Sequence, residues 1–222
     1  MIFPIGDDQV RNGHFPYLSY GFIALNVLIY IWQSSMPYEV YDQFIYHYGA
    51  IPGEITQGVD LYTLLTSAFL HASWMHLIGN MVFLWVFADN IEATIGSRRF
   101  LVFYLIVILA AHAGHIYFNW YSNIPTVGAS GAIAAVMGAY LVMYPKSRIR
   151  TLVFFFFIRI PAFLFLGFWI IQQSYSGVQN LSNMSGSGVA WWAHIGGFAF
   201  GALAGLFFRR MIPEVEPVED YA

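Results

Sequence analysis

The chain alternates between long apolar runs and shorter polar connections, and this alternation predicts most of its architecture. A helix needs about 20 apolar residues to cross a bilayer, and shorter runs can lie in thinned or protein-buried regions. Six runs come close to this length and predict six membrane-spanning helices. Their approximate bounds are Tyr17–Ser34, Leu61–Ala88, Phe100–Phe118, Gly128–Tyr144, Pro161–Tyr175 and Val189–Phe208.

The segments outside these runs predict a single membrane domain over residues 1–222. Residues 1–16 form a cytoplasmic segment that is polar and carries Asp7, Asp8 and Arg11, unlike a cleavable signal peptide. Residues 17–208 would form the six-helix core. Residues 209–222 would form a short cytoplasmic tail, whose acidic end is typical of a disordered segment. The sequence shows no internal repeat and no soluble domain.

Composition agrees with a polytopic membrane protein. Of the 222 residues, 59% are hydrophobic and only 9% are charged, which lies far outside the range of soluble domains. The absence of cysteine excludes disulfides and thiolate metal sites. The net charge of -3 gives no indication of nucleic-acid binding.

The lysines and arginines predict the orientation of the chain. All nine lie before run one, between runs two and three, between runs four and five, or after run six: Arg11, Arg98, Arg99, Lys146, Arg148, Arg150, Arg159, Arg209 and Arg210. Because cytoplasmic loops carry the excess of these residues, both termini should be cytoplasmic. The starts of runs two, four and six should then face outward. We expect a multi-pass protein of the cell (inner) membrane.

Three connections carry expectations of their own. Met36–Asp60 is rich in tyrosine and lacks Lys and Arg, so it should lie in the outer interface. Thr151–Ile160 contains four consecutive phenylalanines and is interpreted as a membrane-hugging lead-in to the fifth helix, which Pro161 would begin. Ser182–Gly188 is either a mobile cap over a site or a simple linker.

A serine between glycines begins the fourth run, in Gly128-Ala129-Ser130-Gly131. Clusters of small residues often only let membrane helices pack closely, and the serine hydroxyl then bonds to its own helix. A histidine at the start of the sixth run, His194, changes this interpretation. Histidine is the usual base that activates a nucleophilic serine. The two residues therefore predict a nucleophile and its base.

The spacing of small residues predicts that these two side chains meet. Two stripes have helical spacing: His194, Gly197, Gly201 and Gly205 in the sixth run, and Ser130, Ala134 and Gly138 in the fourth. Residues at this spacing share one helix face, and small side chains let two backbones approach closely. Such packing would press His194 against the turn that carries Ser130.

Two polar residues of the second run, His76 and Asn80, predict an oxyanion hole. They are four residues apart, share a helix face and could both donate hydrogen bonds to a developing negative charge. A metal site is the competing interpretation. His71 and His76 do not share a face well, however, and the chain has no His-Glu-x-x-His motif.

Two further mechanisms receive less support. The pair His112 and His115 in the third run could bind a metal, but no acidic or thiolate partner lies nearby. Packing or interhelical hydrogen bonding is therefore the favoured interpretation of this pair. An aspartyl mechanism is excluded because no two Asp residues lie within the runs.

Taken together, these motifs resemble the rhomboid family of intramembrane serine proteases. The resemblance rests on Gly128-x-Ser130-Gly131, Ala193-His194-x-x-Gly197 and His76-x-x-x-Asn80. It extends over nearly the whole chain, through Phe3-Pro4 with Asp7-Asp8, Glu92-x-x-x-Gly96, Tyr144-Pro145-Lys146 and Ile160-Pro161-Ala162. Each motif alone is modest, and their order and spacing make the resemblance specific.

The resemblance implies an all-α membrane protein, a six-transmembrane-helix bundle of the rhomboid type with both termini cytoplasmic. Ser130 would be the nucleophile and His194 the general base and acid, with no third acidic residue. His76, Asn80 and the backbone N–H of Ser130 would form the oxyanion hole, and the backbone N–H of Ala129 is a further candidate. Family members cleave transmembrane segments of other membrane proteins near the outer face.

The resemblance also implies structural roles. Glu92 and Gly96 would tie helix ends together on the cytoplasmic side, and Phe168 and Trp169 of the fifth helix would form a gate for substrates. The remaining structural positions of the motifs are Gly128, Gly131, Gly197 and Gly201.

One position departs from the family pattern. Some members have Tyr or Phe four residues after the nucleophile, stacked on the histidine, where this chain has Ala134. The ring of His194 would then be held by Trp191, by Trp192 or by packing alone.

The leading hypothesis is a serine endopeptidase that acts inside the membrane, without metal or cofactor, on single-pass or polytopic membrane proteins. The alternative is a rhomboid-like protein that binds transmembrane helices without cutting them. A transporter is disfavoured because the polar residues cluster at one end of the runs and do not follow a path across the membrane. The sequence names neither the substrate nor the oligomeric state.

Overall fold

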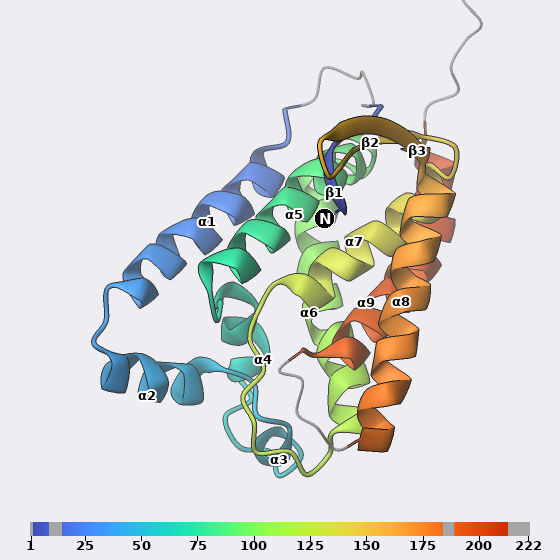
Figure 1. Ribbon diagram of the computed structural model, residues 1–222. Coiled ribbons are helices and arrows are strands. Elements are labelled where there is room, and N and C mark those ends of the chain that lie inside the picture. Colours follow the sequence, from blue (N-terminus) through green and yellow to red (C-terminus); the bar gives the residue numbers. More distant parts are fainter. Residues whose placement is uncertain (1, 9–14, 184–188, 213–222) are drawn as a thin grey trace, which may run out of the picture.

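The computed structural model describes residues 2–8, 15–183 and 189–212. It shows a helical bundle with a small antiparallel sheet at one end (Figure 1). The main helices are α1 (Tyr17–Ser34), α2 (Tyr38–Tyr48), α3 (Pro52–Ile55), α4 (Thr63–Thr66), α5 (Trp74–Ile95), α6 (Ser97–Phe118), α7 (Ser130–Met143), α8 (Ala162–Asn183) and α9 (Trp191–Phe208). Short 3-10 turns follow α4 and α9, at Ser67–Phe69 and Arg209–Met211. The strands are β1 (Ile2–Gly6), β2 (Arg148–Val153) and β3 (Phe156–Pro161).

All six predicted apolar runs fold mainly as helix, but fewer of them qualify as membrane spans by length and apolarity. Among the described residues, α6 and the helix Trp191–Met211 qualify alone, and α4 with its 3-10 turn forms a third candidate with α5, bent by 93°. The apolar helix α7 has only 14 residues. Polar side chains such as Asn26 in α1 and Gln173 in α8 lower the apolarity of those two helices.

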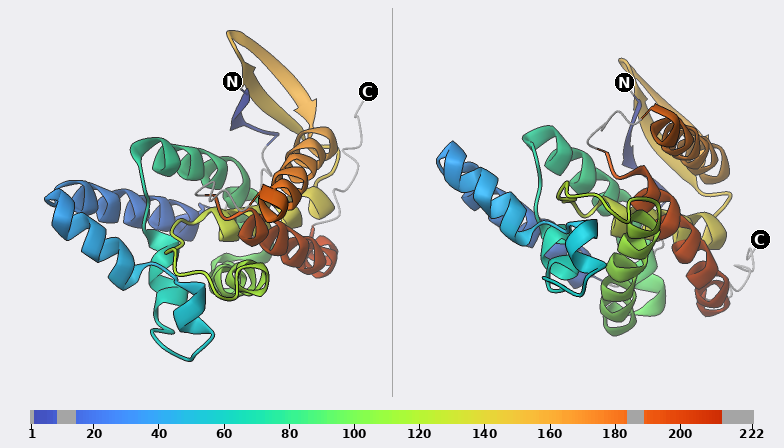
Figure 2. Two further views of the ribbon diagram at one scale, coloured as in Figure 1. Left: turned by 60° about the horizontal axis from the view of Figure 1, so that its bottom comes forward. Right: turned by 90° about the horizontal axis from the view of Figure 1, so that it is seen from below.

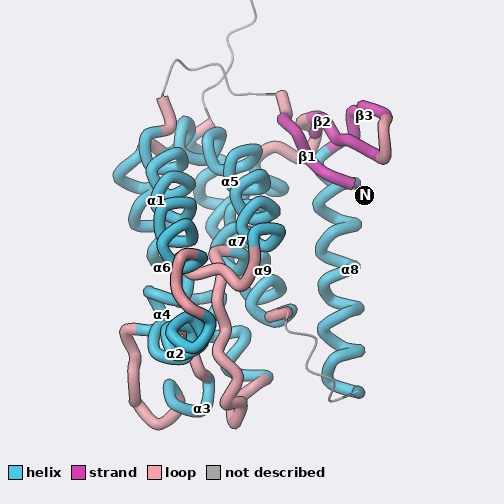
Figure 3. The backbone as a smooth tube through the Cα atoms, turned by 60° about the vertical axis from the view of Figure 1, so that its left-hand side comes forward, coloured by secondary structure: helices cyan, strands magenta, loops and turns pink. Residues whose placement is uncertain are grey.

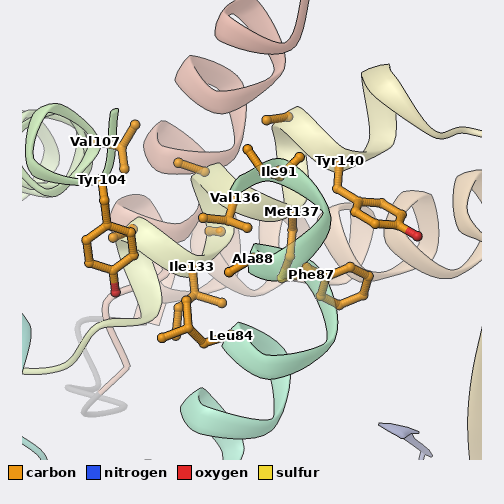
Figure 4. Packing of buried hydrophobic residues seen from close by; sticks show 14 of the residues in the cluster. Leu84, Phe87, Ala88, Ile91, Tyr104, Val107, Ile133, Val136, Met137 and Tyr140 are labelled. Atoms are coloured by element: carbon orange, nitrogen blue, oxygen red, sulfur yellow. The ribbon is translucent and has the colours of Figure 1, made fainter. Parts of the chain in front are cut away.

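The buried apolar side chains gather around α7, which lies in the middle of the bundle. Every residue from Gly131 to Tyr140 is buried. Figure 4 shows Ile133, Val136 and Met137 of this helix between side chains of α5 and α6. Lipid tails are as apolar as a protein core, so helix association in a bilayer depends on close packing and not on removal of water. A short central helix enclosed on all sides meets this requirement.

The helix α9 lies against α7 with almost no side chain between the two backbones. A Cβ atom added at Gly197 would overlap the carbonyl oxygen of Gly131, and one added at Gly201 would overlap that of Ala135. The close approach predicted from the glycine spacing of α9 is therefore confirmed.

The stripe on α7 that makes this contact differs by one residue from the prediction. The backbone of α9 meets Gly131, Ala135 and Ala139, not Ser130 and Ala134. Gly138, the third member of the predicted stripe, does pack against the backbone of Phe198. This rotation leaves the Ser130 side chain beside the α7–α9 interface instead of inside it.

A buried carboxylate joins three helices at the sheet end of the bundle. Glu92 of α5 accepts hydrogen bonds from the backbone N–H groups of Leu18 (3.1 Å) and Ser19 (2.8 Å), from Ser19 Oγ (2.7 Å) and from Ser97 Oγ (2.6 Å). The first N–H groups of a helix have no partner within it, so this carboxylate caps α1. Gly96, with φ of 81°, forms the turn between α5 and α6.

The three-stranded sheet corrects the all-α prediction. Thr151–Ile160, interpreted as a lead-in to the fifth helix, does precede α8 directly, but it folds as strand. β2 and β3 form a hairpin in which Val153 pairs with Phe156, and β1 pairs with β2 in the order β1-β2-β3. Figure 2 shows the hairpin projecting away from the helices. Branched and aromatic residues favour strands, and the prediction weighed only their apolarity.

The N-terminal strand is held to the bundle by Asp7. Its buried carboxylate accepts hydrogen bonds from Asn90 Nδ2 of α5 (2.8 Å) and from the Tyr140 hydroxyl of α7. Burial raises the pKa of Asp7 to about 6, against its ordinary value of 3.8. The first described segment of the chain is thus tied to the central helix.

Met36–Asp60, expected in the outer interface, contains α2 and α3. Most of Ser182–Gly188, interpreted as a cap or a linker, lies outside the described residues, as does the acidic end of the tail.

The contact between α7 and α9 predicts the effect of a single methyl group. Gly201→Ala should lower the free energy of unfolding by at least about 1–3 kcal/mol, because a backbone carbonyl cannot move aside as a side chain can. Thermal unfolding in detergent measures the change. Gly167→Ala in α8 is the matched control, since nothing lies within 4 Å of its added Cβ. Equal melting temperatures for the two variants would contradict the packing.

Candidate active site

Ser130 and His194 meet where α7 and α9 begin. Ser130 is the first residue of α7, and His194 lies in the first turn of α9. The two side chains are hydrogen bonded, with 2.8 Å between His194 Nε2 and Ser130 Oγ. His194 is buried and Ser130 is half-buried. This is the arrangement of a serine next to a base that can take its proton.

The other ring nitrogen of His194 contacts Gln173, a residue that the sequence analysis missed. Gln173 Oε1 of α8 lies 2.7 Å from His194 Nδ1, and the side chain is 5% exposed. The amide nitrogen of Gln173 donates to Gln172 Oε1 at 2.6 Å, which fixes the amide with its oxygen toward the histidine. An amide oxygen only accepts, so Nδ1 carries the proton and the lone pair of Nε2 faces Ser130. A glutamine within an apolar run was the available signal.

Two tryptophans surround the ring of His194. Its centroid lies 5.8 Å from that of Trp169 in α8 and 6.2 Å from that of Trp191 in α9, the latter edge-on at 88°. Trp192, the other candidate from the sequence, stacks instead on Phe118 with 3.6 Å between centroids. Gln173, Trp169 and Trp191 therefore contact the ring of His194. They take the place of the aromatic side chain that is missing at Ala134.

His76 and Asn80 lie on α5, which begins beside the site. The hydroxyl of Ser73 caps this helix by accepting a hydrogen bond from the His76 N–H at 3.1 Å. The buried Asn80 amide lies 2.9 Å from His71 Nε2, and the ring of His71 is edge-on to that of His76. His71 thus fixes one N–H of Asn80 and leaves the second for another acceptor.

The four predicted side chains line one pocket of about 270 Å³. Its walls come from α5, α7, α8 and α9, and they are Met75, His76, Gly79, Asn80, Phe83, Ser130, Ile133, Met137, Trp169, Gln173, Trp191 and His194. Most of this lining is apolar, with the polar groups converging near Ser130. Figure 3 shows α8 as the outermost helix on this side of the bundle.

The position two residues before Ser130 requires a glycine, Gly128. Its φ of 123° is a conformation that other residues rarely adopt. A Cβ atom at this position would lie 2.7 Å from Cε1 and 2.8 Å from Nε2 of His76. The loop before Ser130 therefore packs directly against the His76 ring.

A second cavity, of about 20 Å³, lies beside Ser130 and is lined in part by His112, Thr126 and Gly128. This volume holds about one water molecule. His112 Nε2 lies 3.0 Å from Ser67 Oγ, and His115 Nε2 lies 2.9 Å from Thr126 Oγ1. Interhelical hydrogen bonding is confirmed for His112, whose partner lies in the 3-10 turn Ser67–Phe69, whereas the partner of His115 lies in the loop before α7. Among the residues that the structure describes, no cluster of three or more His, Cys, Asp or Glu suits a metal ion.

Comparison with known proteins gives a consistent result. The sequence model of the Rhomboid domain matches residues 59–211, which include every residue of the pocket. The Rhomboid protease GluP of Bacillus subtilis is 31% identical over 217 residues, 92% of this chain and 39% of the relative. RHOMBOID-like protein 12, mitochondrial, of Arabidopsis thaliana is 32% identical over 167 residues (68% and 47%), and Rhomboid protein 1, mitochondrial, of Saccharomyces cerevisiae is 25% identical over 209 residues (88% and 54%). The chain spans about half the length, or less, of these relatives.

The packing of Gly128 predicts that a methyl group there disturbs the site. Gly128→Ala should lower labelling of Ser130 by a fluorophosphonate probe roughly 10- to 100-fold, because the His76 ring and the serine loop must move apart. Gly79→Ala is the control, since Gly79 lines the same pocket and its added Cβ meets nothing within 4 Å. Equal labelling of both variants, with unchanged melting temperatures, would contradict this description of the loop.

Proposed function

The chain belongs to the rhomboid family, and on this basis we propose that it is an intramembrane serine endopeptidase that cleaves transmembrane segments of other membrane proteins. The observation that supports this most is the 2.8 Å contact between Ser130 Oγ and His194 Nε2 at the edge of an apolar pocket. A serine without a neighbouring base would be too weak a nucleophile for this reaction.

In the proposed reaction, Ser130 Oγ attacks the scissile carbonyl while His194 Nε2 accepts the hydroxyl proton. The histidine then donates this proton to the leaving amine, which leaves an acyl group on Ser130. A water molecule, deprotonated by the same nitrogen, releases the acyl group and restores the serine. The cavity of about 20 Å³ next to Ser130 is large enough to hold this water molecule.

The tetrahedral intermediates carry a negative oxygen, and the proposal assigns its stabilisation to His76, Asn80 and the backbone N–H of Ser130. Ser130 is at the N-terminus of α7, where N–H groups are free and the helix dipole favours an anion. The backbone N–H of Ala129 is a further candidate. Donors held in place before the reaction lower the barrier because they need no reorganisation.

The proposed site has no acidic residue beside the serine and the histidine, and Gln173 orients the histidine in its place. Its carbonyl oxygen holds the Nδ1 proton of His194 and so keeps Nε2 available as the base. A neutral acceptor fixes the tautomer without adding a charge to the membrane interior. We assign Gln173 as a positioning residue.

In the proposed topology, the chain crosses the cell (inner) membrane six times and has both termini on the cytoplasmic side, as the Lys and Arg positions predict. The 14 residues of α7 extend over about 21 Å, less than the roughly 30 Å of a hydrocarbon core. If α7 ends at the cytoplasmic interface, Ser130 lies below the outer surface. Substrate helices would reach it sideways between α5 and α8, past Phe168 and Trp169.

The alternative function is capture of transmembrane helices without cleavage. It would use the same apolar pocket but would require neither the Ser130–His194 contact nor the Gln173 contact. Both contacts are present, which favours the protease.

The central test is cleavage of a fluorescent single-pass reporter by the purified chain in detergent. We expect cleavage by the natural chain and none by Ser130→Ala or His194→Ala, each of which removes one partner of the reaction. Binding of the reporter, measured by fluorescence anisotropy, should persist in both variants. If all three chains bind and none cleaves any of a panel of reporters, the helix-capturing function would replace the protease.

The role of Gln173 predicts a difference between two substitutions. Gln173→Ala should lower kcat by about 10- to 100-fold with little change in KM, because the histidine loses its orientation and not its contact with substrate. Gln173→Glu should keep most of the activity, since it retains an acceptor oxygen and Gln172 can turn its amide to donate. A loss confined to KM, or equal losses of kcat in both variants, would contradict a positioning role.

A further inference from the structure

The tip of the β2–β3 hairpin presents an apolar surface that no described part of the chain covers. Phe154, Phe155, Phe156 and Phe157 are 69%, 91%, 73% and 75% exposed. They are consecutive in the chain, so the tip is apolar on both faces of the hairpin. Exposed phenylalanines occur singly on many proteins, but a contiguous group marks a contact with a partner or a membrane.

The backbone of the turn indicates that these side chains serve something other than the turn. Val153 pairs with Phe156, so Phe154 and Phe155 form a two-residue turn, and Phe154 has φ of 54°. Glycine, asparagine or aspartate normally occupy such positions because a bulky side chain is strained there. A turn selected for stability alone would not carry phenylalanine at this position.

Behind the aromatic tip, the hairpin is cationic. From Lys146 to Pro161 the sequence has four Lys or Arg residues and no Asp or Glu. Arg150 and Arg159 are directly opposite each other in the strand register, an arrangement that destabilises a strand pair unless anions lie nearby. Arg148, Arg150 and Arg159 are all exposed. The guanidinium of Arg150 lies over Gly6, next to the carboxylate of Asp7, and the backbone N–H of Arg148 donates to Asp8 Oδ2 at 3.1 Å.

The base of the hairpin is fixed to the helices. β3 continues directly into α8. The junction is tied to the chain before β2, since Ala162 N donates to Ser147 O at 2.8 Å and Phe163 N donates to Pro145 O at 3.1 Å. Figures 2 and 3 show the hairpin extending outward beside the first turn of α8, at the end of the bundle where β1 lies. The tip is therefore held at the level of the helix ends and directed away from the bundle.

We propose that this tip inserts its phenylalanines into the bilayer leaflet at the β1 end of the bundle, while Arg148 and Arg159 bind the phosphate groups of anionic phospholipids. An aromatic tip flanked by cations matches the order of layers that it would meet, acyl chains and then charged headgroups. A second copy of the chain fits less well, because two such hairpins side by side would bring their exposed arginines, which have like charge, close together.

The inference rests on the membrane location of the chain and not on its cleavage activity. Insertion of the hairpin tip would also affect α8. An anchored tip would fix the start of α8 in the leaflet, while Trp169 and Gln173 lie further along the same helix, at the pocket. Lipid binding at one end would thus restrict which part of α8 can move.

The absence of cysteine from the chain allows a direct test by spin labelling. Phe155→Cys in the full chain carries a nitroxide, and the protein is reconstituted in phosphatidylcholine vesicles with or without phosphatidylglycerol. Collision rates with oxygen, which concentrates in lipid, and with a water-soluble nickel chelate are then compared. Arg98→Cys is the control, since Arg98 is exposed at the polar start of α6.

We expect the oxygen-to-nickel ratio at position 155 to exceed that at position 98 several-fold in both kinds of vesicle, and to rise further with phosphatidylglycerol. Nickel access at position 155 equal to that at position 98 would overturn the insertion. Protection from both reagents would also overturn it and would indicate burial against another copy of the chain.

The arginines are tested in the same background. The double variant Arg148→Gln, Arg159→Gln should keep the high oxygen-to-nickel ratio at position 155 and lose its increase with phosphatidylglycerol. If the increase persists unchanged in the double variant, the assignment of these two arginines to anionic lipid is wrong. Unchanged melting temperatures of the labelled chains show that the effects do not come from unfolding.

Discussion

The structure depends on direct contact between the backbones of α7 and α9. Gly197 and Gly201 of α9 leave no room for a Cβ atom against Gly131 and Ala135 of α7. In a bilayer, where apolar side chains gain nothing by leaving lipid, such contact is a main source of helix association. It also fixes the distance between the first turns of the two helices, and therefore the distance between Ser130 and His194.

The other groups of the site come from helices outside this pair. Asn80 and His76 belong to α5, whose far end is tied to α1 and α6 through Glu92, and Gln173 belongs to α8, the outermost helix in Figure 3. Ser130 and His194 are thus held by direct contact between two helix backbones, while Gln173, which contacts His194, lies on the peripheral helix α8. Movement of α8 would alter the orientation of His194 without separating it from Ser130.

The sequence predicted the helices and the approach of α9 to α7 from local periodicity, although the face assigned to α7 was wrong by one residue. Apolar length defines the six runs, and glycine spacing defines the face of α9. It missed Gln173 because a contact between α8 and α9 depends on the tilt and rotation of two helices, which no spacing within one helix encodes. It missed the sheet because pairing of β1 with β2 joins segments more than 140 residues apart. The aromatic run of the hairpin predicts contact with the membrane, but four consecutive apolar residues show no alternation that would predict a strand.

The most direct measurement for the proposed chemistry is a structure of the chain after reaction with a peptidyl aldehyde, which forms a hemiacetal with an activated serine. The account predicts a covalent bond to Ser130 Oγ, with the former carbonyl oxygen within hydrogen-bonding distance of His76, Asn80 and the Ser130 N–H. It also predicts that Gln173 still contacts His194. An unmodified Ser130, or an adduct whose oxygen faces away from α5, would contradict the assignment of this pocket as a protease site.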